Sequence, residues 1–182
     1  ESDEGQYNDE GEIFWASGAA CLIRKSVFGQ LGGFYGYFFM HNEEIDLCWR
    51  ARNAGWTIKY NGLSVVKHLG GGSLQKESPR KTHFNFRNNL VMNTRNMPLL
   101  QLCWVLPLRF LLDLAACFKF IVSGSAENGM AVLKAWFQFL GWLIMPAAGK
   151  WPGNRGWANN KGRYTGSIVF RYFLQGKKKW PL

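Results

Sequence analysis

The chain changes character at Pro98, and this change limits the folds open to it more than any other feature of the sequence. Residues 1–95 carry ten acidic and eleven basic side chains, whereas residues 96–182 carry two acidic and eleven basic ones. Two apolar, aromatic stretches, residues 99–122 and 130–148, follow the proline. We therefore expect a nearly neutral first part and a helical second part with an anionic neighbour.

The second part is predicted to associate with a membrane. A proline and three charged residues interrupt residues 99–122, so this stretch is a poor membrane span despite its length. Residues 130–148 contain a single charge, but their glycine, proline and aromatic side chains also fit a helix in the headgroup layer. Three interpretations of these two stretches are open. We prefer helices that lie in the membrane interface, place buried core helices second, and place a single membrane-spanning helix third. The basic run at residues 177–179, with nearby tryptophans, fits the edge of a membrane surface.

Composition and cysteines favour a reduced compartment. A chain of 182 residues with 47% hydrophobic side chains is long enough for one domain with a core. Its four cysteines show neither a C-x-x-C pair nor zinc-ligand spacing, which favours the cytosol. Because the chain begins with an acidic stretch and no signal segment, we expect a piece of a longer protein. We predict residues 97–182 as a basic, membrane-associating extension of residues 1–96, at the cytoplasmic face of the plasma membrane, peripheral or with a single span.

The first part combines short strand and helix patterns. Residues 14–24 are small and apolar, which predicts a buried strand approached closely at Gly18. Ser26 is expected to cap a brief helix that ends at two glycines. Asn42 is expected to cap a helix over residues 43–54.

Two further patterns follow that helix. Residues 56–60 and 63–68 flank an Asn-Gly pair, which predicts two extended segments around a tight turn. Ser78 and Pro79 form an N-cap and first-turn pair for a basic helix that runs to Asn96. We therefore expect an α/β first part, with short strands and helices, followed by apolar or amphipathic helices.

The most informative segment is HNEEIDLCWR at residues 41–50, where three carboxylates occupy four positions of a helix start. Carboxylates at this spacing repel one another. Together with partial burial, this repulsion would raise the pKa of one carboxylate toward a value suited to a general base. The helix dipole opposes this effect. Acids in a first helical turn are also common capping residues, so both interpretations stay open.

Three other groups are candidates for binding. His68 follows a predicted strand and precedes three glycines, so it is placed to reach a metal or a phosphate, although a structural histidine has the same pattern. The basic helix from Pro79 offers a face for a diphosphate or a lipid headgroup, or simply a solvated face. Nucleic-acid binding is disfavoured, because the aromatic residues sit in apolar helices and no nucleic-acid motif is present.

Four blocks of the sequence together resemble one enzyme family. They are FWASGAACLIRKSVFGQLGGF, FFMHNEEIDLCWRARNAGW, VVKHLGGGSL and KESPRKTHFNFRNNL, in this order over residues 13–90. They are similar to the acceptor-side half of a family 2 glycosyltransferase with the GT-A fold, of the bacterial surface-polysaccharide type. The resemblance implies an inverting hexosyltransferase that uses a nucleotide-sugar donor and a glycan or lipid-linked acceptor, with no nucleic-acid partner. The alternative from the residues alone is a non-catalytic module that binds an anionic membrane surface through its basic tail.

The resemblance also implies roles for particular residues. Glu44 takes the place of the base that deprotonates the acceptor hydroxyl, with Glu43 as the fallback. His68 corresponds to a histidine that ligates the divalent cation in some members. Ser17 and Gly18 match a close-backbone position beside the transferred sugar. The further substrate-binding candidates are Asp46, Arg80, Lys81 and Arg87.

The sequence departs from the family pattern in two places. At the position of the catalytic base, Glu44 replaces the aspartate of the family, so the side chain that carries the carboxylate is one methylene longer. The Asp-x-Asp motif that binds the nucleotide and most of the metal is absent from the 182 residues. We therefore expect the nucleotide-binding half, with most of the Mg²⁺ or Mn²⁺ site, to lie outside this chain, and the isolated piece to be inactive.

Overall fold

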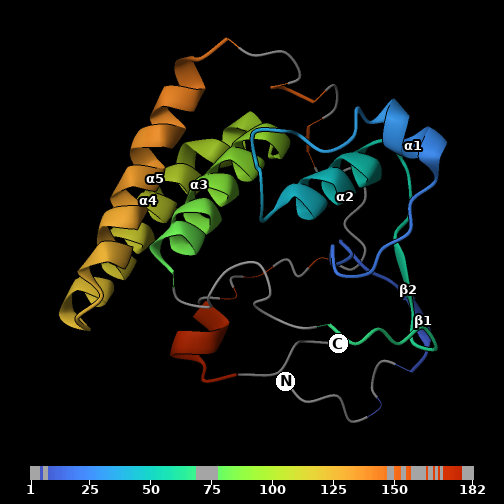
Figure 1. Cartoon of the computed structure of the whole chain (residues 1–182), viewed down its shortest axis with the longest axis horizontal. Coiled ribbons are helices and arrows are strands. Elements are labelled where there is room, and N and C mark those ends of the chain that lie inside the picture. The colour runs from blue at the N-terminus through green and yellow to red at the C-terminus, as the bar shows by residue number, and fades with distance from the viewer. Residues whose placement is uncertain are drawn as a thin grey trace.

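The computed structural model describes residues 5, 8–68, 78–146, 150–152, 155–156, 163, 166, 168 and 170–177. The described part is mixed α/β and mostly helical (Figure 1). This confirms the α/β class, while the GT-A half-domain stays a prediction. The helices are α1 (Lys25–Gln30), α2 (Glu43–Asn53), α3 (Pro79–Asn96), α4 (Leu99–Val122) and α5 (Ala126–Ile144), with a π-helical turn η1 (Phe170–Leu174), and the strands are β1 (Glu10–Glu12) and β2 (Lys59–Asn61).

The boundaries of α3 and α4 follow the sequence signals. The Ser78 hydroxyl accepts a hydrogen bond from the backbone N–H of Lys81 at 3.3 Å, and Pro79 occupies the first turn of α3. Pro98 separates α3 from α4, because a proline disfavours helical geometry at the residue before it. The predicted limits of both helices are therefore confirmed, whereas α5 begins four residues earlier than the expected residue 130.

The expected strand over residues 14–24 is wrong. This segment has no regular structure before α1 begins, and residues 17–26 are exposed. A strand needs a neighbour for its backbone groups, and the ladder of the described sheet ends beside this segment, where the Ile13 N–H donates to the Ile58 carbonyl at 3.0 Å. Residues 14–18 instead run alongside α2, where Phe14 packs edge-on against Trp49.

The expected hairpin and two caps are also corrected. The turn after Asn61 is present, but β2 pairs antiparallel with β1, and residues 63–68 are exposed without strand structure. Asn42 precedes α2 without a side-chain cap, because its backbone lies in the left-handed region at φ 70°. Arg24, rather than Ser26, is the N-cap of α1, and it too lacks a side-chain cap hydrogen bond.

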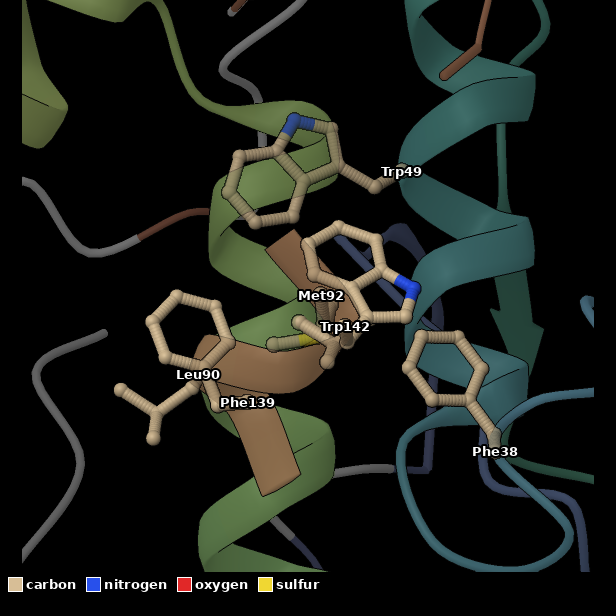
Figure 2. Packing of buried hydrophobic residues seen from close by; sticks show 7 residues of the cluster. Phe38, Trp49, Leu90, Met92, Phe139 and Trp142 are labelled. Carbon is tan, nitrogen blue, oxygen red and sulfur yellow. The ribbon is translucent and has the colours of Figure 1, made fainter. Parts of the chain in front are cut away.

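The core joins α2, α3 and α5. Trp49 of α2, Leu90 of α3, and Phe139 and Trp142 of α5 are almost fully buried together with Phe38 (Figure 2). Phe139 and Trp142 stack with ring centroids 6.1 Å apart. Burial of side chains this large dominates the stability of a small core. The helices after Pro98 therefore share a core with the helix that carries the acidic cluster.

Among the described residues, no helix combines the length and the apolar composition needed to cross a lipid bilayer.

Candidate functional site

Glu44 lies against the backbone of Gly18. A Cβ atom built on Gly18 would be 3.8 Å from Glu44 Cδ and 3.9 Å from its Cβ and Cγ atoms. Gly18 reaches this position because residues 14–18 run alongside α2, while Glu44 occupies the first turn of that helix. The two positions that the sequence analysis singled out 26 residues apart are thus neighbours in the structure.

Three polar residues at the start of α2 have buried side-chain atoms without a hydrogen-bond partner. Within the described part of the chain, Glu43 Oε2, Glu44 Oε2 and His41 Nε2 are buried and make no hydrogen bond. An unpaired buried carboxylate oxygen costs free energy, and such groups are characteristic of binding and catalytic sites. We call Gly18, His41, Glu43 and Glu44 the acidic site. The sequence analysis gave His41 no role, although only Asn42 separates it from the acids.

Burial changes the acidity of one member of this site. Desolvation raises the pKa of Glu43, the neighbouring Glu44 carboxylate raises it further, and a backbone hydrogen bond and His41 oppose the shift. The folded state therefore favours protonated Glu43, so this part of the stability is present at acid pH and is lost as pH rises through the elevated pKa. A raised pKa also makes a carboxylate a stronger base.

The turn before the acids has an unusual backbone. Phe39, His41 and Asn42 have positive φ angles of 61°, 64° and 70°. This region is unfavourable for residues other than glycine, most of all for a bulky one, and such strain is concentrated at functional sites. The strained turn sets the direction in which α2 begins and hence the position of Glu44.

Two buried residues of α3 hold this turn. Asn88 is fully buried, and its Nδ2 lies 2.9, 2.5 and 2.9 Å from the carbonyls of Phe38, Met40 and His41. Arg87 Nε donates to Asn88 Oδ1 at 2.9 Å, which orients the amide. The sequence analysis missed Asn88, because an asparagine inside a basic helix shows no sign of a partner 47 to 50 residues away.

Replacement of Asn88 by alanine is expected to loosen the turn. Three carbonyls lose their shared donor, which should destabilise the turn by about 1–3 kcal/mol. Hydrogen exchange should show faster exchange for the amides of residues 38–44. Asn85→Ala is the matched control, because Asn85 is exposed on the same helix. Unchanged exchange in the Asn88→Ala variant would show that the turn is stable without the hydrogen bonds of Asn88.

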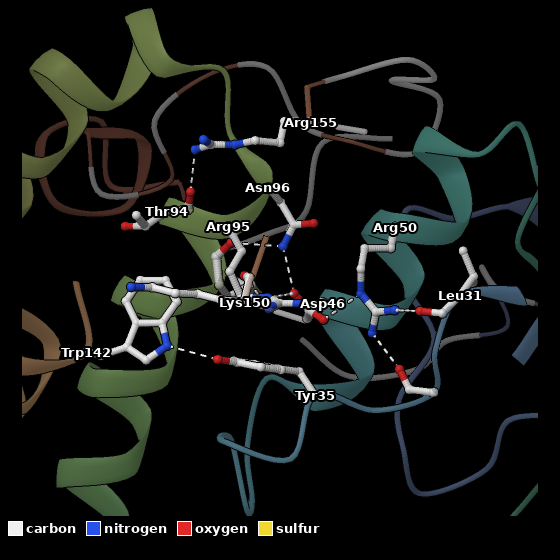
Figure 3. A network of polar contacts seen from close by, with 12 residues as sticks. Leu31, Tyr35, Asp46, Arg50, Thr94, Arg95, Asn96, Trp142, Lys150 and Arg155 are labelled. Atoms are coloured by element: carbon white, nitrogen blue, oxygen red, sulfur yellow. Dashed lines mark hydrogen bonds and ion pairs between the residues drawn. The ribbon is translucent and has the colours of Figure 1, made fainter. Parts of the chain in front are cut away.

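Asp46, a predicted substrate contact, has no exposed surface. Its Oδ1 accepts hydrogen bonds from Arg95 Nε at 3.0 Å and Asn96 Nδ2 at 2.8 Å, and its Oδ2 accepts one from Arg50 Nε at 2.8 Å (Figure 3). Arg50 also donates a hydrogen bond from its Nη1 to the Leu31 carbonyl at 2.6 Å. Asp46 thus joins α2 to α3 and to the segment after α1, a structural role that differs from the predicted substrate contact.

The basic residues of α3 divide into two groups. Arg80 is exposed beside Phe39 and Phe84, with its guanidinium 5.6 and 5.8 Å from the two ring centroids, and Lys81 is partly exposed. Arg87 instead points inward, where it donates to two carbonyls of the segment before α2. Burial lowers the pKa of Arg87. Arg80 and Lys81 are accessible to a phosphate, whereas Arg87 stabilises the segment before α2 through its hydrogen bonds.

The two remaining predicted residues, Ser17 and His68, are exposed. Ser17 is exposed, and its hydroxyl accepts a hydrogen bond from the Ala19 N–H at 3.3 Å. His68 is exposed at the end of a described segment, and the glycines that follow it lie outside the described residues. No group of three His, Cys, Asp or Glu side chains in the described part of the chain is arranged to hold a metal ion.

Curated relatives of the chain are glycosyltransferases. An N-acetylglucosaminyl-diphospho-decaprenol L-rhamnosyltransferase of Mycobacterium tuberculosis is 42% identical over 59 residues, which is 32% of this chain and 19% of that protein. The low-salt glycan biosynthesis hexosyltransferase Agl10 of Haloferax volcanii is 31% identical over 77 residues, which is 42% of this chain and 25% of that protein. The matches thus span a quarter or less of these relatives. No protein-family model and no solved structure matches the chain.

Proposed function

We propose that this chain forms the acceptor side of the catalytic site of an inverting family 2 glycosyltransferase with the GT-A fold. The observation that carries the proposal is the contact between Glu44 and Gly18, since it places a partly buried carboxylate against an open backbone position. Both short matches to glycosyltransferases support the class of enzyme. The complete protein would transfer a hexosyl-type sugar from a nucleotide sugar during synthesis of a surface glycan.

In this proposal the residues of the chain have separate tasks. The Glu44 carboxylate takes the proton from the acceptor hydroxyl as the oxygen attacks the anomeric carbon, and Glu43 is the fallback base. Gly18 leaves room for the sugar beside that carboxylate. Arg80 and Lys81 are placed to contact a phosphate of the donor or of a lipid-linked acceptor.

The divalent cation is a separate part of the proposal. Bound Mg²⁺ or Mn²⁺ would stabilise the departing diphosphate. The described residues do not form a site for it, since they contain no suitable group of three ligands. We assign most of the ligands to the nucleotide-binding half and one position to His68, and we derive no step through the metal.

The same substitution at two different glycines, Gly18 and Gly36, tests the proposal in the complete protein. A Cβ on Gly18 is tolerated at 3.8 Å from Glu44, but the branches of a valine would displace the carboxylate or occupy the space of the sugar. A displacement of about 1 Å lowers a catalysed rate by about 100-fold. We therefore expect Gly18→Val to reduce sugar transfer by about 100-fold in a radiolabel assay with nucleotide-sugar donors and a prenyl-diphosphate acceptor.

The control for this test is Gly36→Val. Gly36 is exposed, has a negative φ and has no atom within 4 Å of a built Cβ, so the same substitution should leave transfer unchanged. Equal activity of the two variants would reject the sugar-transfer site at Gly18. Absence of transfer by the unmodified complete protein with every nucleotide sugar would reject the proposed function.

A further inference from the structure

On helix α4 an ion pair faces the neighbouring helices, while many of its large apolar side chains are exposed. Asp113 is buried, and its carboxylate binds Arg109 Nε at 2.6 Å and Trp136 Nε1 of α5 at 3.0 Å. Arg109 also donates to Asn89 of α3 at 3.0 Å. Two of the three charged residues of α4, Arg109 and Asp113, therefore attach the helix to α3 and α5, while Lys119 is exposed.

The outer face of α4 is a continuous apolar stripe. At 100° per residue, six exposed large hydrophobic side chains fall within about 40° of one line along the helix, and no polar side chain falls among them. The stripe runs for about 33 Å, and Leu100 and Phe118 are 85% and 69% exposed. Exposed apolar surface of this extent marks an interaction site. The stripe consists of Leu100, Trp104, Leu111, Leu114, Phe118 and Val122.

The charge of the surrounding chain indicates what covers the stripe. Residues 96–182 contain two acids, of which Asp113 is buried in the contacts above, against eleven bases. Lys119 flanks the stripe on α4, and Lys134 is exposed on α5. An apolar strip with exposed lysines on the same helix pair, in a part of the chain rich in bases, complements a lipid bilayer with anionic headgroups. The same charge, +10 for the chain, opposes association of the stripe with a second copy.

We propose that α4 lies flat on an anionic lipid surface, with the stripe inserted among the acyl chains and the basic residues at the headgroups. The exposed stripe supports this contact by itself, and the preference for a bilayer also rests on the proposed function, which includes a lipid-linked acceptor. This goes beyond a general attraction of basic residues to lipid, because it assigns the contact to one face of one helix.

Vesicle flotation of the complete protein tests this proposal. We expect binding to vesicles of phosphatidylcholine with phosphatidylglycerol, weaker binding to phosphatidylcholine alone, and a loss of the difference at high salt. The double variant Leu111→Glu with Phe118→Glu should bind at least about tenfold more weakly, because each buried side chain of this size contributes about one factor of ten or more. The control, Leu63→Glu with Val65→Glu, changes two apolar residues outside α4 that are more exposed than Leu111 and Phe118, and it should bind as the parent does.

A second measurement uses the unmodified protein. Cys103 is exposed on the side of the stripe and Cys21 is exposed far from it in the sequence. Anionic vesicles should slow the alkylation of Cys103 and leave that of Cys21 unchanged, as read by mass spectrometry of the peptides. Equal vesicle binding by parent and double variant, or unprotected Cys103, would overturn the proposal. So would a parent that forms dimers through α4 and ignores vesicles.

The outcome is separable from that of the proposed function. Transfer to a soluble short-chain acceptor needs no bilayer, so the α4 double variant should keep it. Vesicle binding through α4 without any transfer by the parent would reject the glycosyltransferase proposal and leave the α4 proposal standing.

Discussion

Glu44→Gln in the complete protein is expected to lower the rate of sugar transfer by about 10²- to 10⁴-fold, the contribution of a general base. Glutamine keeps the size of the side chain beside Gly18 but cannot accept the acceptor proton. Because Glu44 acts on the acceptor, affinity for the nucleotide sugar should stay the same. Initial rates at saturating donor, with calorimetric titration of the donor, measure the two effects separately.

Two controls make this result specific. Glu127→Gln changes an exposed acid in the first turn of α5, the same position in a helix, and should leave transfer unchanged. Glu43→Gln should lower transfer less than Glu44→Gln does. If the order of the two variants is reversed, Glu43 is the base, in agreement with its raised pKa. Full activity of both would assign these acids to capping alone.

Asp46→Asn is expected to be the most destabilising single substitution near the site. The carboxylate lies between two buried arginines, Arg50 and Arg95, and removal of one partner from a buried ion pair costs about 3–5 kcal/mol. Local opening of α2 and α3 should then be at least about a hundredfold more frequent. Amide hydrogen exchange of these helices in the complete protein measures this opening directly.

Asp113→Asn is the matched control, because it changes a second buried aspartate with an arginine partner. Burial raises the pKa of Asp113 despite Arg109 and the Trp136 N–H, so the fold favours its neutral form. A neutral isostere should therefore cost little there, while the half-exposed Arg109 stays hydrated. Similar effects of the two substitutions would contradict the view that Asp46 neutralises the arginines.

Sequence patterns predicted the parts of the fold that depend on local signals. The Ser-Pro start and Pro98 defined α3 and α4, since caps and prolines act within a few residues. The strand over residues 14–24 was wrong, because an apolar run does not show whether a neighbouring strand is present. The pairing of β1 with β2 joins segments about 50 residues apart and left no local signal.

The site was predicted in part for the same reason. The sequence placed Glu43 and Glu44 at a helix start, and the structure adds their contact with Gly18. The sequence alone did not distinguish Asp46 from the other acids, although Asp46 lies two residues after Glu44 and is therefore rotated by about 200° around the helix, toward the core. On α3, the sequence likewise did not distinguish the buried Arg87 from the exposed Arg80.

The shared core of Trp49, Phe139 and Trp142 has a geometric consequence. Helix α5, which carries α4 on one side, shares this core with α3 and with α2, the helix whose first turn holds Glu44. The acidic site and the outer face of α4 are therefore held at one fixed separation. On a bilayer this rigid spacer would set the height of the carboxylate above the lipid, and only a hydroxyl presented at that height would react.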